Sequence, residues 1–113
     1  MQEETKYARI WRTVAAIPPG KVAAYGLVAD LAGLPGRARY VSRALRAAPR
    51  ELALPWHRVL RADGRVAFEA GSDAAREQAL RLRGEGVEVK RNRVDVRRFG
   101  WKPTLGELLE MDY

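Results

Sequence analysis

The chain has 113 residues, no cysteine, and 21 lysines and arginines against 14 acidic residues, which gives a formal net charge of +7. This length suits one domain, and the sequence has no run of 18 apolar residues that could span a membrane. The lack of cysteine excludes disulfides, thiolate metal sites and thiol nucleophiles. The polar, acidic start does not resemble a signal peptide, so we expect a cytoplasmic protein.

A small domain with this much positive charge favours a polyanionic partner, and nucleic acid is the first candidate. Most of the basic residues are arginines, whose planar guanidinium groups contact phosphates and base edges better than lysine does. The alternative is a soluble protein with a generally basic surface. Charge alone leaves both interpretations open.

The first third of the chain predicts two helices separated by a turn. Apolar side chains recur at helical spacing over residues 5–16. The members of this stripe are Tyr7, Ile10, Trp11, Val14 and Ile17. The turn Pro18-Pro19-Gly20 ends the first helix, and a second short helix is expected over residues 26–32, with Gly33 as its C-terminal cap.

A third helix is predicted over residues 37–48, and its two faces differ. The face expected to turn inward carries Val41, Ala44, Leu45 and Ala48. The opposite face carries Arg39, Arg43, Arg46 and Arg50. Two short helices joined by a Gly-Pro turn, the second one basic, are typical of a helix-turn-helix. A solvated arginine face gives the same pattern, but like charges four residues apart repel each other, so neutralisation by phosphates is the favoured interpretation.

Further along the chain, two turn dipeptides, Asp63-Gly64 and Arg91-Asn92, each lie between two short β-like runs and predict two β-hairpins. The four runs are residues 58–61, 65–68, 87–89 and 94–96. Between them, Ser72 is placed to cap a helix that continues to about residue 83. Thr104 and Glu107 have capping-box spacing, which predicts a short terminal helix.

Residues 55–59, with the sequence Pro-Trp-His-Arg-Val, hold the only histidine of the chain. Alone they are ambiguous, because a Pro-Trp pair entering a strand usually anchors a core. The rest of the sequence offers few residues or motifs that are typical of an enzyme active site. One histidine without cysteine does not make a zinc site of the usual ligands, no Gly-rich phosphate loop is present, and neither Ser42 nor Ser72 lies in a nucleophile-elbow pattern. We expect no metal and no cofactor.

Five blocks of sequence, in this order and spacing, resemble the DNA-binding domain of 6-O-alkylguanine-DNA alkyltransferases. The blocks are Ile17-Pro18-Pro19-Gly20-Lys21-Val22 with Tyr25, Leu34-Pro35, Arg39-Tyr40-Val41-Ser42, Pro55-Trp56-His57-Arg58-Val59 and Leu82-Arg83-Gly84-Glu85-Gly86-Val87. The resemblance covers about residues 7–101 of a single domain over 1–113, with 102–113 as a C-terminal extension. It implies a mostly α fold with small β-hairpins, a winged helix-turn-helix-like domain as in the alkyltransferase C-terminal domain.

In the repair enzymes the central block reads Pro-Cys-His-Arg-Val, and its cysteine accepts the alkyl group. Trp56 stands at that position here, so the chain resembles the alkyltransferase-like branch, which recognises the lesion without repairing it. Alkyl transfer needs a soft nucleophile such as a thiolate, and an indole is a poor acceptor. We therefore expect no enzymatic activity.

The resemblance assigns roles residue by residue. Tyr25 and Arg39 match the residues that rotate the damaged nucleotide out of the duplex and fill the gap. The pocket for the flipped base is expected to be formed by Tyr25, Pro55, Trp56, His57, Val59, Phe68 and Glu69. The DNA-binding residues are expected to be Arg37, Arg39, Ser42, Arg43, Arg46, Ala47 and Ala48. His57 has no thiol to activate and is expected to be a hydrogen-bonding strut behind the pocket.

The function implied is that of a monomeric, nucleoid-associated sensor. It would bind 6-O-alkylguanine in double-stranded DNA through the minor groove and mark it for nucleotide excision repair proteins. Two alternatives stay open: a helix-turn-helix transcriptional regulator, and an inhibitor that blocks alkyltransferase repair. The chain departs from the family at Ala48, where the enzymes usually carry a hinge asparagine, and at Ala24, where a hydroxyl residue is common.

Overall fold

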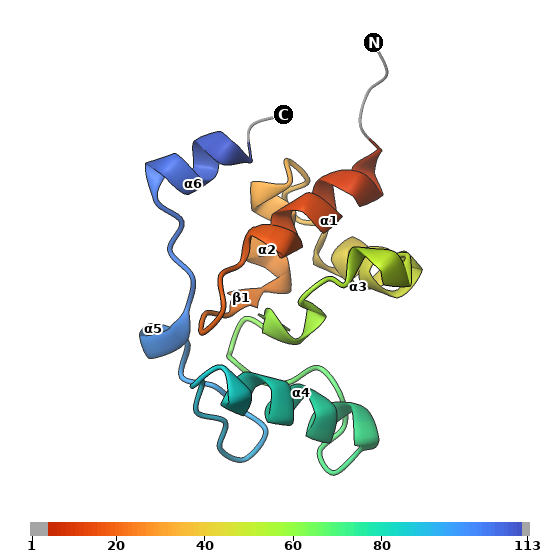
Figure 1. Cartoon of the computed structure of the whole chain (residues 1–113). Helices are drawn as coiled ribbons and strands as arrows, with labels where there is room; N and C mark the ends of the chain where they lie inside the picture. The colour runs from red at the N-terminus through yellow and green to blue at the C-terminus, as the bar shows by residue number, and fades with distance from the viewer. Residues whose placement is uncertain (1–4, 112–113) are drawn as a thin grey trace.

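The computed structural model describes residues 5–111, which are mostly helical (Figure 1). In chain order the elements are α1 (Lys6–Ala16), β1 (Ala23–Ala24), α2 (Tyr25–Leu31), α3 (Ala38–Ala47), the 3-10 turns η1 (Arg50–Leu52) and η2 (Trp56–Arg58), β2 (Val59–Leu60), α4 (Asp73–Gly84), α5 (Val96–Phe99) and α6 (Leu105–Glu110). None of the helices between residues 5 and 111 is long and apolar enough to cross a membrane. The helical class expected from the sequence is confirmed.

Three helices begin where a hydroxyl side chain caps them. The side chains of Thr5, Ser72 and Thr104 each accept a hydrogen bond, of 3.0 to 3.2 Å, from the backbone N–H three residues further on. Each bond satisfies one of the N–H groups that a helix start leaves without a partner. At α6 the Glu107 carboxylate also accepts from the Thr104 N–H at 2.9 Å, which completes the predicted capping box.

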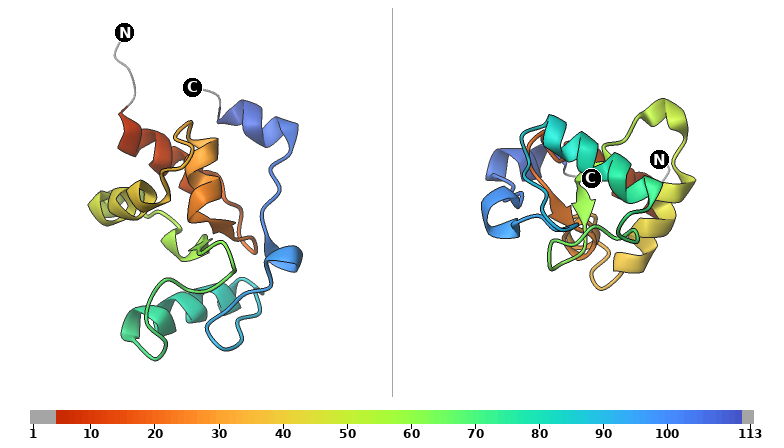
Figure 2. Two further views of the ribbon diagram at one scale, coloured as in Figure 1. Left: turned by 180° about the vertical axis from the view of Figure 1, so that it is seen from behind. Right: turned by 90° about the horizontal axis from the view of Figure 1, so that it is seen from below.

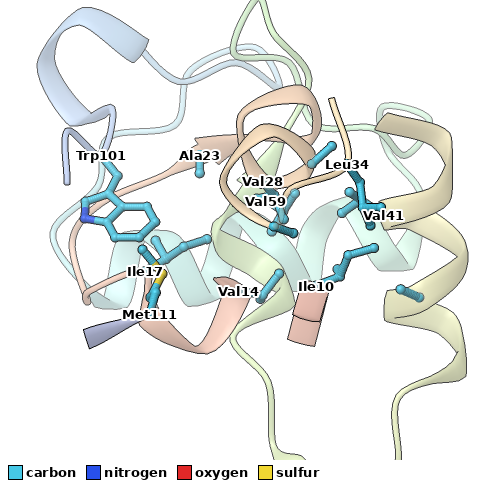
Figure 3. Packing of buried hydrophobic residues seen from close by; sticks show 13 residues of the cluster. Ile10, Val14, Ile17, Ala23, Val28, Leu34, Val41, Val59, Trp101 and Met111 are labelled. Carbon is cyan, nitrogen blue, oxygen red and sulfur yellow. The ribbon is translucent and has the colours of Figure 1, made fainter. Parts of the chain in front are cut away.

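The buried side chains form two clusters. The first joins α1, α2 and α3 to β2 and to the returning C-terminal segment. Figure 3 shows Trp101, Ile17 and Met111 at one end of this cluster and Leu34 and Val41 at the other. The second cluster lies under α4 and consists of Val22, Leu60, Val66, Ala75, Leu82, Val87, Val89 and Val94.

A two-stranded parallel ladder connects the two halves. Ala23 pairs with Val59 and Ala24 with Leu60, and both residues of β2 are buried, as is usual for parallel strands. Tyr25 follows β1 directly and Trp56–Arg58 precedes β2 directly. The ladder therefore sets the helix-turn-helix and the residue 55–59 segment side by side.

The first predicted hairpin forms only at its turn. The Gly64 N–H donates to the Arg61 carbonyl at 2.8 Å, and the Arg61 N–H donates to the Arg65 carbonyl at 2.9 Å. Beyond the turn, however, the Val66 N–H donates to the Asn92 carbonyl at 2.9 Å, and Arg65 bridges to Arg93. The buried Val59–Leu60 pair is taken up by β1, so the chain after the turn pairs with a segment much later in the sequence.

The second predicted hairpin forms only at its turn. Lys90 and Arg93 exchange hydrogen bonds of 2.9 and 3.0 Å, with positive φ values of 51° at Arg91 and 63° at Asn92, as a two-residue hairpin turn requires. Residues 94–96 do not continue as a strand. The Asp95 side chain accepts from the Arg97 N–H at 3.0 Å and starts α5 instead.

The two views from opposite sides place α3 and α6 at different edges of the molecule, with α1 and α2 between them (Figures 1 and 2). The helix predicted to face DNA is thus separated from the acidic C-terminal helix. A surface on α3 can meet a large ligand without displacing α6.

Gly64 and Gly71 make a matched pair for testing the second cluster. Both have positive φ, 88° and 85°, but a Cβ on Gly64 would lie 2.2 Å from the Val94 carbonyl oxygen, whereas nothing lies within 4 Å of one on Gly71. We expect Gly71→Ala to lower the free energy of unfolding by about 1 to 2 kcal/mol through backbone strain alone. Gly64→Ala should lower it by about 3 kcal/mol or more, because the 64–94 hydrogen bond must open. Urea denaturation measures both, and equal losses would contradict the close packing at residue 64.

Candidate nucleic-acid interface

The outer face of α3 presents a row of cations. Arg39, Arg43 and Arg46 are all exposed, and no carboxylate among residues 5–111 forms an ion pair with any of them. Arg37, at the start of the helix, lies over the Tyr40 ring, with its guanidinium carbon 4.9 Å from the ring centroid. Such a row repels itself unless an anion lies against it.

α1 holds α3 in place from behind. The indole N–H of Trp11 donates to the carbonyl of Ala44 at 2.7 Å, one of the carbonyls that the last turn of a helix leaves without a partner. Val41 and Ala44 are fully buried against α1 and α2. The inward face is therefore fixed, and the arginine face is held in one orientation.

The small side chains predicted for close approach lie beside the arginines. Ser42 and Ala48 are half-buried, and Ala47 is exposed. Tyr25, the first residue of α2, lies close enough to Arg46 for their charges to interact. Burial raises the pKa of the Tyr25 hydroxyl, and the positive charge of Arg46 opposes that rise. A neutral phenol and an exposed guanidinium thus share this part of the surface.

The segment with the single histidine makes a tight turn. Residues 56–58 form η2, whose closing bond runs from the Val59 N–H to the Trp56 carbonyl. The Trp56 ring meets the Phe68 ring edge to face at 6.1 Å and the His57 ring at 6.3 Å. The loop before the turn contains Ala53 at a φ of 46°, a conformation that costs an alanine free energy. The backbone here is held in an unfavourable shape by its surroundings.

Glu85 fixes this turn from below. Its carboxylate accepts from Arg58 through Nε at 3.0 Å and Nη2 at 2.6 Å, while His57 Nε2 lies 2.8 Å from Oε2. The Gly20 N–H donates to the same carboxylate at 3.2 Å. The pKa of Glu85 is lowered from 4.5 to about 2, and the hydrogen bonds from Arg58 are the largest cause. Burial opposes this lowering, while the hydrogen bonds from His57 and Gly20 add to it.

Arg58 and Gln78 complete the support. Arg58 Nη1 donates to the Ile17 carbonyl at 2.7 Å, which ties the turn to the end of α1. Gln78 Nε2, buried in α4, donates to the carbonyls of His57 and Val59 at 2.9 and 3.0 Å. His57 is buried among these groups and contacts the Glu85 carboxylate through Nε2.

A cavity of about 490 Å³ opens beside Trp56, between the end of α3 and α4. Its lining residues are Leu45, Ala48, Pro49, Arg50, Ala53, Leu54, Trp56 and Arg81. Of the pocket residues predicted from the sequence, Trp56 lines the cavity, while Phe68 and His57 meet the Trp56 ring. Volumes of this order hold drug-sized ligands.

The other predicted pocket residues lie elsewhere. Val59 has no exposed surface and packs in the first cluster near Val28 (Figure 3), because β2 is buried on both faces. Pro55 is half-buried at the start of η2, and Glu69 is exposed in the loop that precedes α4. Tyr25 lies on α2, on the Arg46 side. The structure brings together the rings of Trp56, His57 and Phe68 and leaves Tyr25 apart from them and Glu69 at the surface.

Sequence reasoning missed Glu85, Gln78 and Arg81 as parts of this site. Gln78 had a usable signal, since it lies between Ala75 and Leu82 on the inward stripe of α4, where a polar side chain needs a buried partner. Glu85 lies in one of the five blocks that resemble the family, but its contacts with His57 and Arg58 had no local signal, and Arg81 had none at all. No three carboxylate or imidazole groups among residues 5–111 are grouped so that they could hold a metal ion.

Comparison with known proteins gives this arrangement its family. Residues 5–87 match the family described as 6-O-methylguanine DNA methyltransferase, DNA binding domain. The Escherichia coli DNA base-flipping protein is 41% identical over 103 residues, which are 89% of this chain and 78% of that protein. Alkyltransferase-like protein 1 of Schizosaccharomyces pombe is 32% identical over 91% of this chain and 100% of its own length.

A solved structure supports the same relationship. S. pombe Atl1 in complex with damaged DNA containing O6-carboxymethylguanine matches with a TM-score of 0.79 at 32% identity, over 91% of this chain and 100% of that one. The fold of this chain is thus shared with a protein seen on damaged DNA. The chain belongs to the family of 6-O-methylguanine DNA methyltransferase DNA-binding domains. Within it, the likeness extends over nearly the full length of an alkyltransferase-like member.

The depressed pKa of Glu85 predicts a pH-dependent stability. A carboxyl group whose pKa is lowered by folding stabilises the protein fully above its ordinary pKa of 4.5, and this contribution is lost as the pH falls through about 2. Glu85→Gln should therefore cost about 3 kcal/mol at pH 7, since it leaves Arg58 without its counter-charge. The difference between the two proteins should shrink as the pH falls from 4.5 toward 2.

Glu77→Gln provides the control, because it removes an exposed ion pair with Arg81 four residues along the same helix. That loss should be about 0.5 kcal/mol. Guanidinium denaturation at several pH values separates the two variants. A pH-independent difference for Glu85→Gln would contradict the ionised network.

Proposed function

We propose that this protein is a non-enzymatic sensor of 6-O-alkylguanine in double-stranded DNA. The observation that carries the proposal is Trp56, which occupies the position of the acceptor cysteine in a chain that has no cysteine at all. The site around it keeps a buried histidine and a carboxylate at 2.8 Å. A site with this frame and no thiol can hold an alkylated base but has no nucleophile to dealkylate it.

Docking on DNA rests on the α3 face. Arg37, Arg43 and Arg46 would contact phosphates, which supply affinity with little sequence preference. The small side chains of Ser42, Ala47 and Ala48 would let the helix approach the minor groove closely. Minor-groove binding with an inserted side chain also bends DNA. The unpaired state of these arginines among the described residues supports this assignment.

Flipping would use Tyr25 and Arg39. Tyr25 would press on the phosphate beside the lesion, and Arg39 would enter the base stack in place of the rotated nucleotide. Extruding a base costs a few kcal/mol, and less for a damaged, weakly paired one. Stacking on Trp56 would return about 1 to 3 kcal/mol. The names and DNA complexes of the relatives support this role, since one is called a DNA base-flipping protein and another is seen on damaged DNA.

The bound lesion would then be marked for nucleotide excision repair. The protein would act as a monomer, with α6 on an edge away from α3 (Figure 1) and thus free while DNA is bound. A sensor of this kind does not alter the base, so another activity must remove it.

Arg39→Ala tests the flipping role. Wild-type protein should bind a 6-O-methylguanine duplex more tightly than the unmodified duplex. Arg39→Ala should lose about tenfold or more in lesion affinity, in the range of interface hot spots, and much less on plain DNA. Fluorescence anisotropy with both duplexes at fixed salt measures this.

Two further arginine variants calibrate that result. Arg43→Ala should weaken both duplexes alike and reduce the salt slope by about one. Arg97→Ala, on α5, should change neither. Equal wild-type affinity for the lesion and the plain duplex would refute the sensor and favour a helix-turn-helix regulator.

Mass spectrometry tests the absence of enzymatic activity. After incubation with a 6-O-methylguanine duplex, the protein mass should be unchanged and the duplex should still contain the lesion. A gain of one methyl group by the protein would overturn the non-enzymatic assignment, and digestion would then locate the acceptor residue.

A further inference from the structure

A second cationic surface lies on two paired turns, residues 61–65 and 90–93, which we call the two-turn surface. Its basic side chains are all exposed, and Asp63 is the one acidic residue within the two turns. The basic residues are Arg61, Arg65, Lys90, Arg91 and Arg93. In all views of Figures 1 and 2, the segment between α4 and α5, which contains the second turn, lies on the side of the molecule away from α3. A straight duplex docked on α3 therefore does not reach it.

Backbone hydrogen bonds hold the two turns together. The Val66 N–H donates to the Asn92 carbonyl and the Val94 N–H donates to the Gly64 carbonyl, both at 2.9 Å. Val66 and Val94 are buried in the second cluster, which fixes both turns to the body of the molecule. The arginines thus project from a backbone that is already ordered, so that binding a ligand does not have to order it.

The positive charge of these turns is only partly neutralised. Asp63 Oδ2 lies 3.5 Å from Arg65 Nε and 3.8 Å from Arg93 Nη2, and the Asp63 side chain is 47% exposed, so water screens both ion pairs. The pKa of Asp63 is lowered chiefly by a hydrogen bond from the Arg65 N–H, and the charges of Arg65, Arg93 and Arg61 add to the lowering. One exposed carboxylate is thus shared among three guanidinium groups.

Arg91 lies at the tip of the second turn, in a backbone conformation that arginine does not favour. Its φ is 51° and that of Asn92 is 63°, and the first central position of such a turn normally carries asparagine, aspartate or glycine. The Arg91 side chain is exposed and forms no ion pair with any carboxylate of residues 5–111. Turn geometry does not account for an arginine here, whereas an anionic ligand at the tip does.

The two turns offer cations without aromatic rings. Neither 61–65 nor 90–93 contains an aromatic residue, whereas proteins that bind single strands stack the bases on aromatic side chains. Guanidinium groups alone are suited to the phosphates of a duplex, which they contact without reading the bases.

We propose that the two-turn surface binds the phosphate backbone of a second DNA duplex while α3 lies on the first one. The inference rests on the proposed docking of α3 on DNA and goes beyond the lesion site. Arg65, Arg91 and Arg93 make the phosphate contacts, and one chain holds both duplexes. Non-specific contacts of this kind have dissociation constants on the order of 10⁻⁴ to 10⁻⁶ M, so the second duplex exchanges while the lesion duplex stays bound.

A capture assay on beads tests this proposal. A short biotinylated duplex with one 6-O-methylguanine is immobilised and loaded with protein, and free protein is washed away. A fluorescent unmodified duplex is then added at micromolar concentration and low salt, and both duplexes are too short to wrap around the protein. Wild-type protein should capture the fluorescent duplex. Because three arginines contact phosphates, capture should fall with rising salt with a log–log slope of about −3.

Two double variants assign the capture to the two turns. Arg91→Asn with Arg93→Gln should reduce capture about tenfold or more and make the salt slope shallower by about two. Asparagine tolerates the positive φ at residue 91, so a weakened turn does not explain that loss. Arg91→Lys with Arg93→Lys keeps both charges and should retain most of the capture, since lysine contacts phosphates as a point charge. Anisotropy at limiting lesion duplex should be unchanged in both variants.

Lys6→Gln with Arg12→Gln is the matched control. Both residues are exposed on α1, outside α3 and the two-turn surface, and their substitution removes the same two positive charges. Capture should stay at the wild-type level. Urea denaturation of each variant confirms that the protein is folded.

The composition of the captured complex separates one chain from two. Native mass spectrometry should give one protein with two duplexes. Two proteins with two duplexes would overturn the proposal, because α3 of another copy would then hold the second duplex. It is also overturned if the Asn/Gln variant captures as wild type does, if the α1 control loses as much, or if a fluorescent single strand is captured better than the duplex.

The assay also distinguishes this proposal from the sensor function. If wild-type protein stays on the lesion duplex and captures nothing, the second surface is refuted and the sensor function stands. If the lesion bead retains no more protein than a bead with plain duplex, the sensor function fails, and capture on the plain bead still tests the second surface.

Discussion

The carboxylate of Glu85 is the point on which the arrangement of this molecule depends. It binds Arg58 and His57 from the Trp-bearing turn and the backbone of Gly20 from the turn after α1, while Arg58 reaches on to the Ile17 carbonyl. A single ionised side chain thus joins three segments that are distant in sequence. In the alkyltransferases, as resemblance implies, a histidine at the position of His57 serves a reactive thiol. Here the same kind of network supports the turn that carries Trp56, whose ring contacts the rings of His57 and Phe68.

Most helices could be predicted because their signals are local. Thr5, Ser72 and Thr104 cap the helices that follow them, and these signals need nothing from the rest of the chain. The strand pairing could not be predicted in this way. Ala23–Ala24 is too short to show a β pattern, and the partner of Val59–Leu60 was decided by burial of both its faces, which is a tertiary effect.

The same division holds for the site. The arginine stripe of α3 follows from the spacing of Arg39, Arg43 and Arg46, and the structure leaves these side chains exposed as expected. Two groups at the cavity come from α4: Gln78 supports the turn and Arg81 lines the cavity, and both roles depend on packing against η2 across more than 20 residues of sequence. Resemblance to the family singled out Trp56, and the structure shows that Trp56 lines a cavity. It gave no information on Arg81, because nothing in the local sequence of α4 indicates which of its arginines faces that cavity.

The contacts of Arg58 also order the events of folding. Its partners lie 41 residues earlier and 27 residues later in the chain, so each contact closes a long loop at an entropic cost. During synthesis α1, α2 and α3 can pack on one another as soon as they have emerged, since their contacts are close in sequence. The turn that carries Trp56 can make its hydrogen bonds to Glu85 only after residue 85 has been synthesised. In a nascent chain the basic face of α3 can therefore form before the cavity beside Trp56 is complete.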